Sequence, residues 1–380
     1  MTDAARILSD VRSMCPLLGT RSREFEADRR IPVDVIDRLK EIGVFRMLVP
    51  RSHGGLELDL ATIVSVIVEL ARADASTAWT AMIGSGSTLY ASMLPKRVYD
   101  AIYVAGPDVV FAGSTQLLGT ARRIDAGWHV SGRWPFASGC LHADWIIGFC
   151  AVEADDPAQP GPPRTLAVVL PASRWRIDDS WHVPGLKATA SHHVALDREI
   201  VATDCLFDLA TGWPWLEGPL YTGVHQILSL LHAAVSLGIA QAALADIVTL
   251  ARSGRRQHLA PAPMRDSEIF QVELGRAQAD VRAAEALLMA QVDSHWCAAR
   301  AGTLATPAKL IEGSQTAIWV ADTCRRATDT CFALGSSAAL YDHSPLQRRM
   351  RDMRVAAQHS YVQPRQYSKA GALLLGTEPA

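Results

Sequence analysis

The sequence predicts an α+β protein with a helical N-terminal domain, a central β domain and a helical C-terminal domain. Apolar residues recur at helical spacing up to about residue 105 and again over 216–380. Between them, residues 106–215 carry short apolar runs interrupted by Gly and Pro, with seven of the ten tryptophans. These two changes of pattern predict domains at 1–105, 106–215 and 216–380.

The N-terminal part contains clear helix ends. Pro32 suits the start of a helix, and Gly43 suits the residue after its last turn. Asp59 can cap a second helix, residues 75–93 predict a third, and Pro95 begins a short fourth.

The middle part predicts a β-barrel or sandwich, and the last part predicts a four-helix-bundle-like domain. Strand-like runs lie at 109–112, 127–131, 145–152, 166–170 and 193–196, and the Pro-rich stretch 154–164 predicts an exposed hairpin loop. Helical segments follow at 228–250, 266–300 and 307–334, with a last pair over 345–376.

Composition argues against several kinds of partner and site. With 37 Lys and Arg against 39 Asp and Glu, the chain has a net charge of −2 and no basic stripe, so we expect no nucleic-acid partner. Seven cysteines without a CxxC pair indicate reduced thiols and no metal site. The N-terminus does not resemble a signal peptide, and no apolar run approaches the ~20 residues of a membrane span. We therefore expect a cytoplasmic protein with no membrane partner.

Several common catalytic motifs are absent from the sequence. No GxGxxG follows a strand, which argues against a bound nicotinamide dinucleotide. Neither HExxH nor GxSxG occurs, so zinc-dependent and serine hydrolysis have no support.

The stretch Ser131–Trp145, SGRWPFASGCLHADW, is the strongest local candidate for a ligand site. In an extended chain the period of two places Trp134, Phe136 and Ser138 on one face. Two aromatic rings and a hydroxyl would suit a flat ligand that needs a wall and one hydrogen bond. An aromatic-rich strand turning a corner in a β domain explains the same residues equally well.

Together with the order α, β, α, four segments resemble the acyl-CoA dehydrogenase fold superfamily. The closest resemblance is to its flavin-dependent monooxygenase branch, the oxygenase halves of two-component systems. It covers nearly the whole chain and rests on SGRWPFASGCLHADW, WHVPGLKATASHHVAL, LGIAQAAL and FALGSSAALYDHSPLQRRMRD.

The resemblance implies a set of cofactor-binding residues. Ser138 falls where the family hydrogen-bonds the reactive edge of the flavin, and Phe136 falls where an aromatic ring packs on it, with Trp134 on the same expected face. Arg256, or its neighbour Arg255, falls where a guanidinium meets flavin phosphate across a subunit interface, a contact that suits bidentate binding.

Departures from the dehydrogenase pattern are equally informative. The glutamate that removes the α-proton in dehydrogenases falls on Ser360, and a second family placement falls near Leu228. Neither position carries a carboxylate. Phe332 replaces the glutamine usually found before the glycine turn, which weakens one expected flavin contact.

His359, beside Ser360, falls where the monooxygenase branch resembles a catalytic base. In that branch reduced flavin and O₂ give a C4a-hydroperoxide, which an aromatic substrate attacks best while its hydroxyl or ring N–H loses a proton. An imidazole with an ordinary pKa near ~6.5 can take that proton at neutral pH. Catalytic residues are therefore expected at His359 and Ser138.

The resemblance implies a homotetramer that uses reduced flavin, FADH2 or FMNH2, with molecular oxygen to hydroxylate a phenolic, indolic or polycyclic aromatic substrate. A separate NAD(P)H:flavin reductase would supply the reduced flavin. Three alternatives remain at this stage: an N-hydroxylating monooxygenase acting on an amine or amino sugar, an acyl-CoA dehydrogenase with an unrecognised base, and a non-catalytic scaffold.

Overall fold

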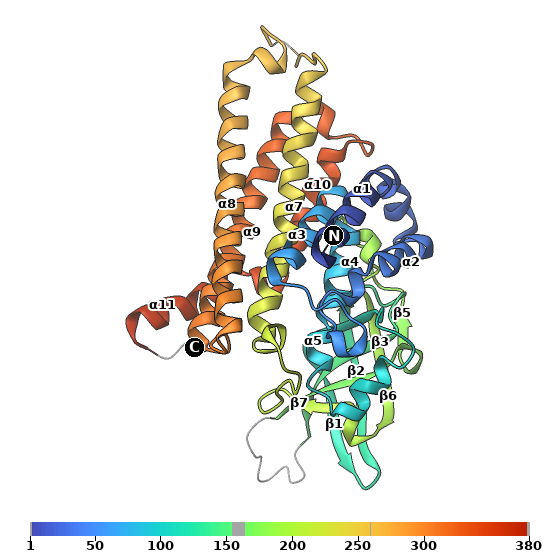
Figure 1. Ribbon diagram of the computed structural model, residues 1–380. Helices are drawn as coiled ribbons and strands as arrows, with labels where there is room; N and C mark the ends of the chain where they lie inside the picture. Colours follow the sequence, from blue (N-terminus) through green and yellow to red (C-terminus); the bar gives the residue numbers. More distant parts are fainter. Residues whose placement is uncertain (1, 154–163, 259, 378–380) are drawn as a thin grey trace.

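The computed structural model describes residues 2–153, 164–258 and 260–377. It has the predicted order of helices, strands and helices, with the sheet at one end of the molecule and the long tail helices at the other (Figure 1). Helix gives way to strand between Ile102 and Phe111 and returns after Asp208. The predicted loop at 154–164 falls, apart from Arg164, outside the described residues.

The N-terminal part consists of short helices whose ends follow the sequence signals. Asp59 caps α3 by accepting a hydrogen bond from the backbone N–H of Thr62 at 2.8 Å. Gly43, with a φ of 96°, ends α2 in the left-handed conformation that glycine adopts without strain. The single helix expected over 75–93 is divided into two. The helices are α1 Asp3–Asp28, α2 Val33–Ile42, α3 Leu60–Ala73, α4 Ala75–Gly86, α5 Thr88–Ala91 and α6 Lys96–Ile102.

The sequence predicted a barrel or sandwich for the β part. The structure has one seven-stranded mixed sheet there. The strand order is β5-β6-β2-β1-β3-β4-β7, and among the described residues only the β1–β3 pair is parallel. The short edge strands β5 and β7 have no counterpart among the runs picked out from sequence. The strands are β1 Phe111–Ile124, β2 Gly127–Ala137, β3 Trp145–Val152, β4 Thr165–Pro171, β5 Arg176–Asp178, β6 His192–Val201 and β7 Leu206–Asp208.

The C-terminal part packs three long helices and two short ones. They are α7 Val224–Arg252, α8 Glu268–Arg300, α9 Pro307–Gly335, α10 Pro345–Ala356 and α11 Tyr367–Leu375. In contrast to the sequence expectation, α7 is long and apolar enough to cross a membrane by length and composition, but 89% of its most apolar stretch is buried inside the protein. Its apolar residues on all sides therefore identify it as a central core helix.

The loop over residues 180–191 fastens the sheet to the helices. Asp352 of α10 is buried, and its carboxylate accepts a hydrogen bond from the backbone N–H of Leu186 at 2.7 Å. Next to it, Arg351 pairs with Glu26 of α1 at 2.7 Å. All three parts of the chain thus meet at this loop.

Gly185 provides a test of this junction, because a Cβ there would lie 2.2 Å from the backbone oxygen of Arg351. We expect Gly185→Ala to lower the free energy of unfolding by about 1–3 kcal/mol, the usual effect of overpacking. Gly19→Ala on α1 is the matched control, since nothing lies within 4 Å of its Cβ position. There, alanine should stabilise by about 0.5–1 kcal/mol. Equal denaturant midpoints for the two variants would contradict the tight junction.

Candidate functional site

Trp134 does not face a ligand site. It is fully buried in the sheet core, where its Nε1–H donates to the backbone oxygen of Phe149 at 2.7 Å. The expectation that Trp134, Phe136 and Ser138 share one face is wrong. Phe136 has a φ of 66°, and the pairing of β2 with β6 shifts between Trp134 and Ala137, so strict alternation ends there. No ring face of Trp134 is left for a cofactor.

Phe136, in contrast, stands out from the sheet. Its side chain is 53% exposed and meets Trp181 edge-on, with ring centroids 6.1 Å apart at 85°. A bulky residue with positive φ is rare, and such strained backbone concentrates at functional sites. The exposed ring suits the predicted contact with a flat cofactor.

Behind Phe136, the hydroxyl of Ser138 belongs to a directional relay of hydrogen bonds. Trp79 Nε1–H donates to Ser138 Oγ at 3.0 Å, and Ser138 Oγ lies 2.7 Å from Ser191 Oγ. Ser191 Oγ lies 2.6 Å from Thr189 Oγ1, which donates to the backbone oxygen of Leu186 at 2.8 Å. Because that carbonyl can only accept, each hydroxyl proton points toward it. Ser138 therefore offers a lone pair to any ligand.

His359 lies against a second imidazole that the sequence analysis missed. Its ring stacks on His232 of α7, with centroids 4.0 Å apart at 24°. His359 Nδ1 accepts the backbone N–H of Tyr361 at 3.3 Å, so the neutral ring carries its proton on Nε2. His232 Nδ1 lies 2.9 Å from the carbonyl oxygen of Leu228 and must donate to it. Neutral His232 therefore has its lone pair on Nε2.

The two stacked imidazoles are held in the neutral state. Burial lowers the pKa of His232 to about 4. Burial, with the adjacent His232 ring as a second cause, lowers the pKa of His359 well below its ordinary value. His232 Nε2 is buried and has no hydrogen-bond partner among the described residues.

Two tyrosines and a third histidine extend this group toward the surface. Tyr361 hydroxyl lies 3.2 Å from that of Tyr90 and 3.0 Å from His225 Nδ1. The ring of Tyr361 also lies 5.1 Å from that of His232. Burial raises the pKa of Tyr90 and Tyr361, so both phenols stay protonated. We call the following six residues the aromatic cluster: Trp79, Tyr90, His225, His232, His359 and Tyr361.

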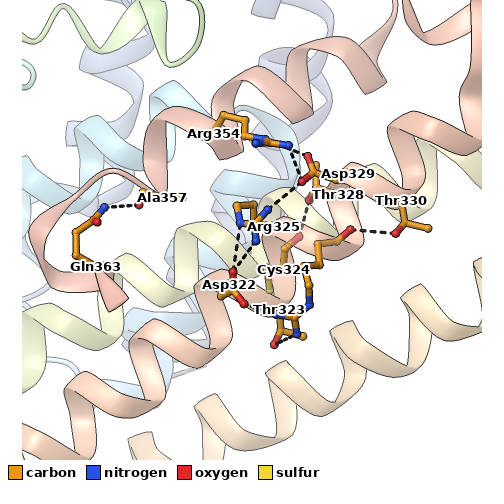
Figure 2. A network of polar contacts seen from close by, with 11 residues as sticks. Asp322, Thr323, Cys324, Arg325, Thr328, Asp329, Thr330, Arg354, Ala357 and Gln363 are labelled. Carbon is orange, nitrogen blue, oxygen red and sulfur yellow. Dashed lines mark hydrogen bonds and ion pairs between the residues drawn. The ribbon is translucent and has the colours of Figure 1, made fainter. Parts of the chain in front are cut away.

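The segment that carries His359 is anchored at both ends. Figure 2 shows Arg354 of α10 reaching across to Asp329 of α9, at 2.8 Å. Asp329 also pairs with Arg325 at 3.1 Å, and Gln363 Nε2 donates to the backbone oxygen of Ala357 at 2.9 Å (Figure 2). These contacts fix the turn that follows α10 and hence the position of His359.

Arg256 lies in the connection between α7 and α8, at the far end of the tail helices from the sheet (Figure 1). Its guanidinium is exposed and donates to the backbone oxygens of Ala260 and Pro261 at 2.7 and 2.9 Å. Arg255 instead contacts Ser337 Oγ at 3.2 Å. Within one chain, neither arginine lies near Ser138 or His359. The predicted contact of Arg256 or Arg255 with flavin would therefore have to be made across a subunit interface.

The residues around Ser138 fit a flavin ring. Phe136 supplies an exposed wall, Ser138 an acceptor, and Thr80 Oγ1 on α4 is buried without a partner among the described residues. In the part of the chain that the structure describes, no group of three or more His, Cys, Asp or Glu is placed to hold a metal ion. A surface hollow of about 460 Å³ lies outside the aromatic cluster and is lined by Glu26, Ala27, Arg29, His182, Val183, Pro184 and Lys187.

Family models match both helical parts of the chain. A model described as "Acyl-CoA dehydrogenase, N-terminal domain" matches residues 12–95, and one described as "Acyl-CoA dehydrogenase, C-terminal domain" matches residues 230–364. The indole-3-acetate monooxygenase of Pseudomonas putida is 32% identical over 375 residues, which cover 95% of this chain and 92% of that protein. The oxygenase component of an FADH(2)-dependent resorcinol hydroxylase from a Rhizobium species is 30% identical, with coverage of 98% and 95%.

Solved structures show the same fold. XiaF from a Streptomyces species, in complex with FADH2 and glycerol, superposes with a TM-score of 0.92 at 26% identity and covers 99% of this chain and 96% of its own. The 3-HSA hydroxylase from Rhodococcus gives a TM-score of 0.91 at 26% identity, with coverage of 99% and 98%.

The low pKa of His232 makes stability depend on pH. Below pH ~6.5, the ordinary pKa of histidine, His232 is protonated in the unfolded chain but not in the folded chain. Stability is therefore lost as pH falls toward 4. We expect His232 to contribute roughly 3 kcal/mol to this loss. His232→Leu should therefore lose less stability than the wild type between pH 7 and pH 4 in denaturant titrations.

Asp352 serves as an internal control for that comparison. Burial raises the pKa of Asp352 to about 7, so its effect on the free energy of unfolding has the opposite sign. Protonation of Asp352 on acidification stabilises the fold. Because this contribution is present in both proteins, the difference between them isolates His232. Parallel stability curves over this pH range would show that His232 is not held neutral by the fold.

Proposed function

Because the chain belongs to the acyl-CoA dehydrogenase family and, within it, to the flavin-dependent monooxygenases, we propose that it hydroxylates a small aromatic substrate as the oxygenase component of a two-component system. Reduced flavin, FADH2 or FMNH2, supplies the electrons that activate O₂ when it is bound. A separate NAD(P)H:flavin reductase supplies the reduced flavin. Relatives that are named as oxygenase components and as FADH(2)-dependent support this division of labour.

The observation that carries the proposal is the stacked pair His232–His359. Dehydrogenation of an acyl thioester needs a carboxylate base, whereas Leu228 and Ser360 occupy the two positions where the family places it. Next to these positions are two neutral imidazoles, His232 one turn after Leu228 and His359 just before Ser360, among aromatic side chains. Such surroundings suit a flat ring, and a neutral imidazole can exchange a proton with it.

Ser138 and Phe136 are proposed to hold the flavin ring. The relay leaves Ser138 Oγ with a lone pair, which suits an N–H donor such as the one at the reactive edge of reduced flavin. Phe136 supplies the exposed aromatic wall beside it. Ser138 itself is buried, at 5% relative exposure, which suits an edge to be kept from water.

The alternatives have less support. An N-hydroxylase acting on an amino sugar is suggested by one solved neighbour, KijD3, but at 19% identity that likeness shows the fold alone. An acyl-CoA dehydrogenase would need a base that neither Leu228 nor Ser360 supplies. A non-catalytic scaffold does not account for two buried imidazoles beside a hydroxyl relay.

The proposal is tested by dependence on a reductase. With NADH and either indole-3-acetate or resorcinol as probe, the purified chain alone should give no product. Added flavin reductase and flavin should restore turnover, with ¹⁸O from ¹⁸O₂ in the product by mass spectrometry. Efficient NADH oxidation by the chain alone, or dye reduction with butyryl-CoA and oxidised flavin, would refute the proposal.

Ser138→Ala sharpens the same assay. One neutral hydrogen bond contributes about 0.5–1.5 kcal/mol, so flavin affinity should fall by no more than about tenfold. More H₂O₂ per NADH should be released, because the edge that the hydroxyl protects is opened. Ser65→Ala on α3 is the control, since the Ser65 hydroxyl donates to the backbone carbonyl of Ala61 in its own helix. Unchanged H₂O₂ release with a larger loss of affinity would contradict the assignment.

We also propose a homotetramer in the cytoplasm. Supporting this, α8 and α11 expose large apolar side chains: Ile269, Val272, Leu373, Leu374 and Leu375. The connection between α7 and α8, which carries Arg256, lies at the opposite end of these helices from the sheet, as expected of a segment that reaches a neighbour's flavin phosphate (Figure 1). All seven cysteines are free thiols, in keeping with a reducing compartment.

Light scattering on wild type and a Leu374→Glu, Leu375→Glu double variant tests the assembly. The wild type should be a tetramer, and the double variant should dissociate because it places charge in an apolar contact. Flavin affinity should fall in the dissociated double variant. Arg256→Ala should also bind flavin more weakly, but it should remain a tetramer. A monomeric wild type that binds reduced flavin tightly would refute the assembly.

A further inference from the structure

His232 has unused hydrogen-bonding capacity at the centre of the site. Its side chain is 4% exposed, and its Nε2 is buried with no partner among the described residues. A buried polar atom without a partner loses its hydrogen bonds to water on folding, so it calls for an explanation. The Nδ1–H bond to Leu228, at 2.9 Å, fixes this free nitrogen as a hydrogen-bond acceptor.

Its stacking partner has the opposite character. His359 Nδ1 is occupied by the backbone N–H of Tyr361, so the nitrogen that remains, Nε2, is a donor. The two rings are in direct contact, with centroids 4.0 Å apart, so the two free nitrogens belong to one stacked pair. The pair thus presents one acceptor and one donor, each set by a backbone group that cannot change its role.

Resting on the proposed function, we propose that His232, rather than His359, receives the hydrogen of the substrate's ring N–H or O–H through Nε2, while His359 donates. As the substrate ring gives up electrons to oxygen, that hydrogen becomes acidic. The proton passes to His232 Nε2, the N–H or O–H electron pair stays on the substrate, and the imidazole becomes an imidazolium. His359, stacked on it, must stay neutral, because two charges at this separation repel strongly.

The surrounding groups favour rapid return of the proton. Among the described residues, Tyr361 lies against the pair, and Tyr90 and His225 contact the Tyr361 hydroxyl. None of these three side chains is an acid that would hold an imidazolium in place. Burial disfavours the charged form of His232, whose pKa is about 4. His232 therefore acts as a transient acceptor and returns to the neutral state before the next substrate binds.

Indole and 1-methylindole separate the two histidines, because the indole N–H can only donate a hydrogen bond and the methylated ring lacks it. Binding is measured by anaerobic equilibrium dialysis with full-length protein loaded with reduced flavin. The wild type should prefer indole by about threefold to tenfold, the effect of one hydrogen bond. His232→Leu should abolish this preference, and His359→Leu should keep it.

Two further variants guard against nonspecific effects. His232→Gln can place an amide oxygen near the former Nε2, so it should recover part of the preference without restoring hydroxylation. His295→Leu on α8 removes another buried histidine whose Nε2 has no partner in the described chain, and it should keep the full preference.

The outcomes distinguish this inference from the proposed function. No preference in the wild type, or a preference lost in His359→Leu and kept in His232→Leu, overturns the role of His232. A wild-type preference that disappears only in His232→Leu supports it, even if no hydroxylated product forms. Product formation without any preference leaves the proposed function standing and refutes the inference.

Discussion

The site depends on burying two imidazoles in contact with each other without a carboxylate to charge them. Desolvation lowers the pKa of both imidazoles, and the stacked His232 lowers that of His359 further, so both rings rest neutral. Each ring is then held in one tautomer by a backbone group, the carbonyl of Leu228 or the N–H of Tyr361. Neutrality makes the pair compatible with the surrounding aromatic wall. It also separates this protein from family members that need a charged base.

Each part of the fold contributes to that arrangement. The N-terminal helices bring Trp79 and Tyr90, the sheet brings Ser138, and α7 with the turn after α10 brings the histidines. The loop over 180–191 serves both sides: Thr189 and Ser191 orient the Ser138 hydroxyl, and Leu186 binds Asp352 of α10. Ser138 and the imidazole pair are therefore positioned by one continuous set of contacts, which runs through Trp79 between Ser138 and His359.

Sequence patterns predicted the fold class, most helix ends and the family, because these depend on local spacing and on motifs that are contiguous in the chain. They could not predict the orientation of Trp134, because a positive φ at Phe136 ends the alternation of side chains. They also missed His232 and Tyr90, which lie singly in apolar helices and become neighbours of His359 only through tertiary packing. The sequence also did not show that α7 is a core helix. It is apolar on all sides because it is surrounded by protein, which only tertiary packing reveals. Arg256 remains a prediction, since its proposed partner is in another subunit.

The measurement that tests the central claim most directly is ¹⁵N NMR of the protein labelled at its 12 histidines. Substitution of His232 and His359 in turn assigns their signals. At pH 7 the account predicts two neutral imidazoles of opposite tautomer, with the proton on Nδ1 in His232 and on Nε2 in His359, and neither charged on acidification to pH 5.5. An imidazolium at pH 7, or the same tautomer in both rings, would contradict it.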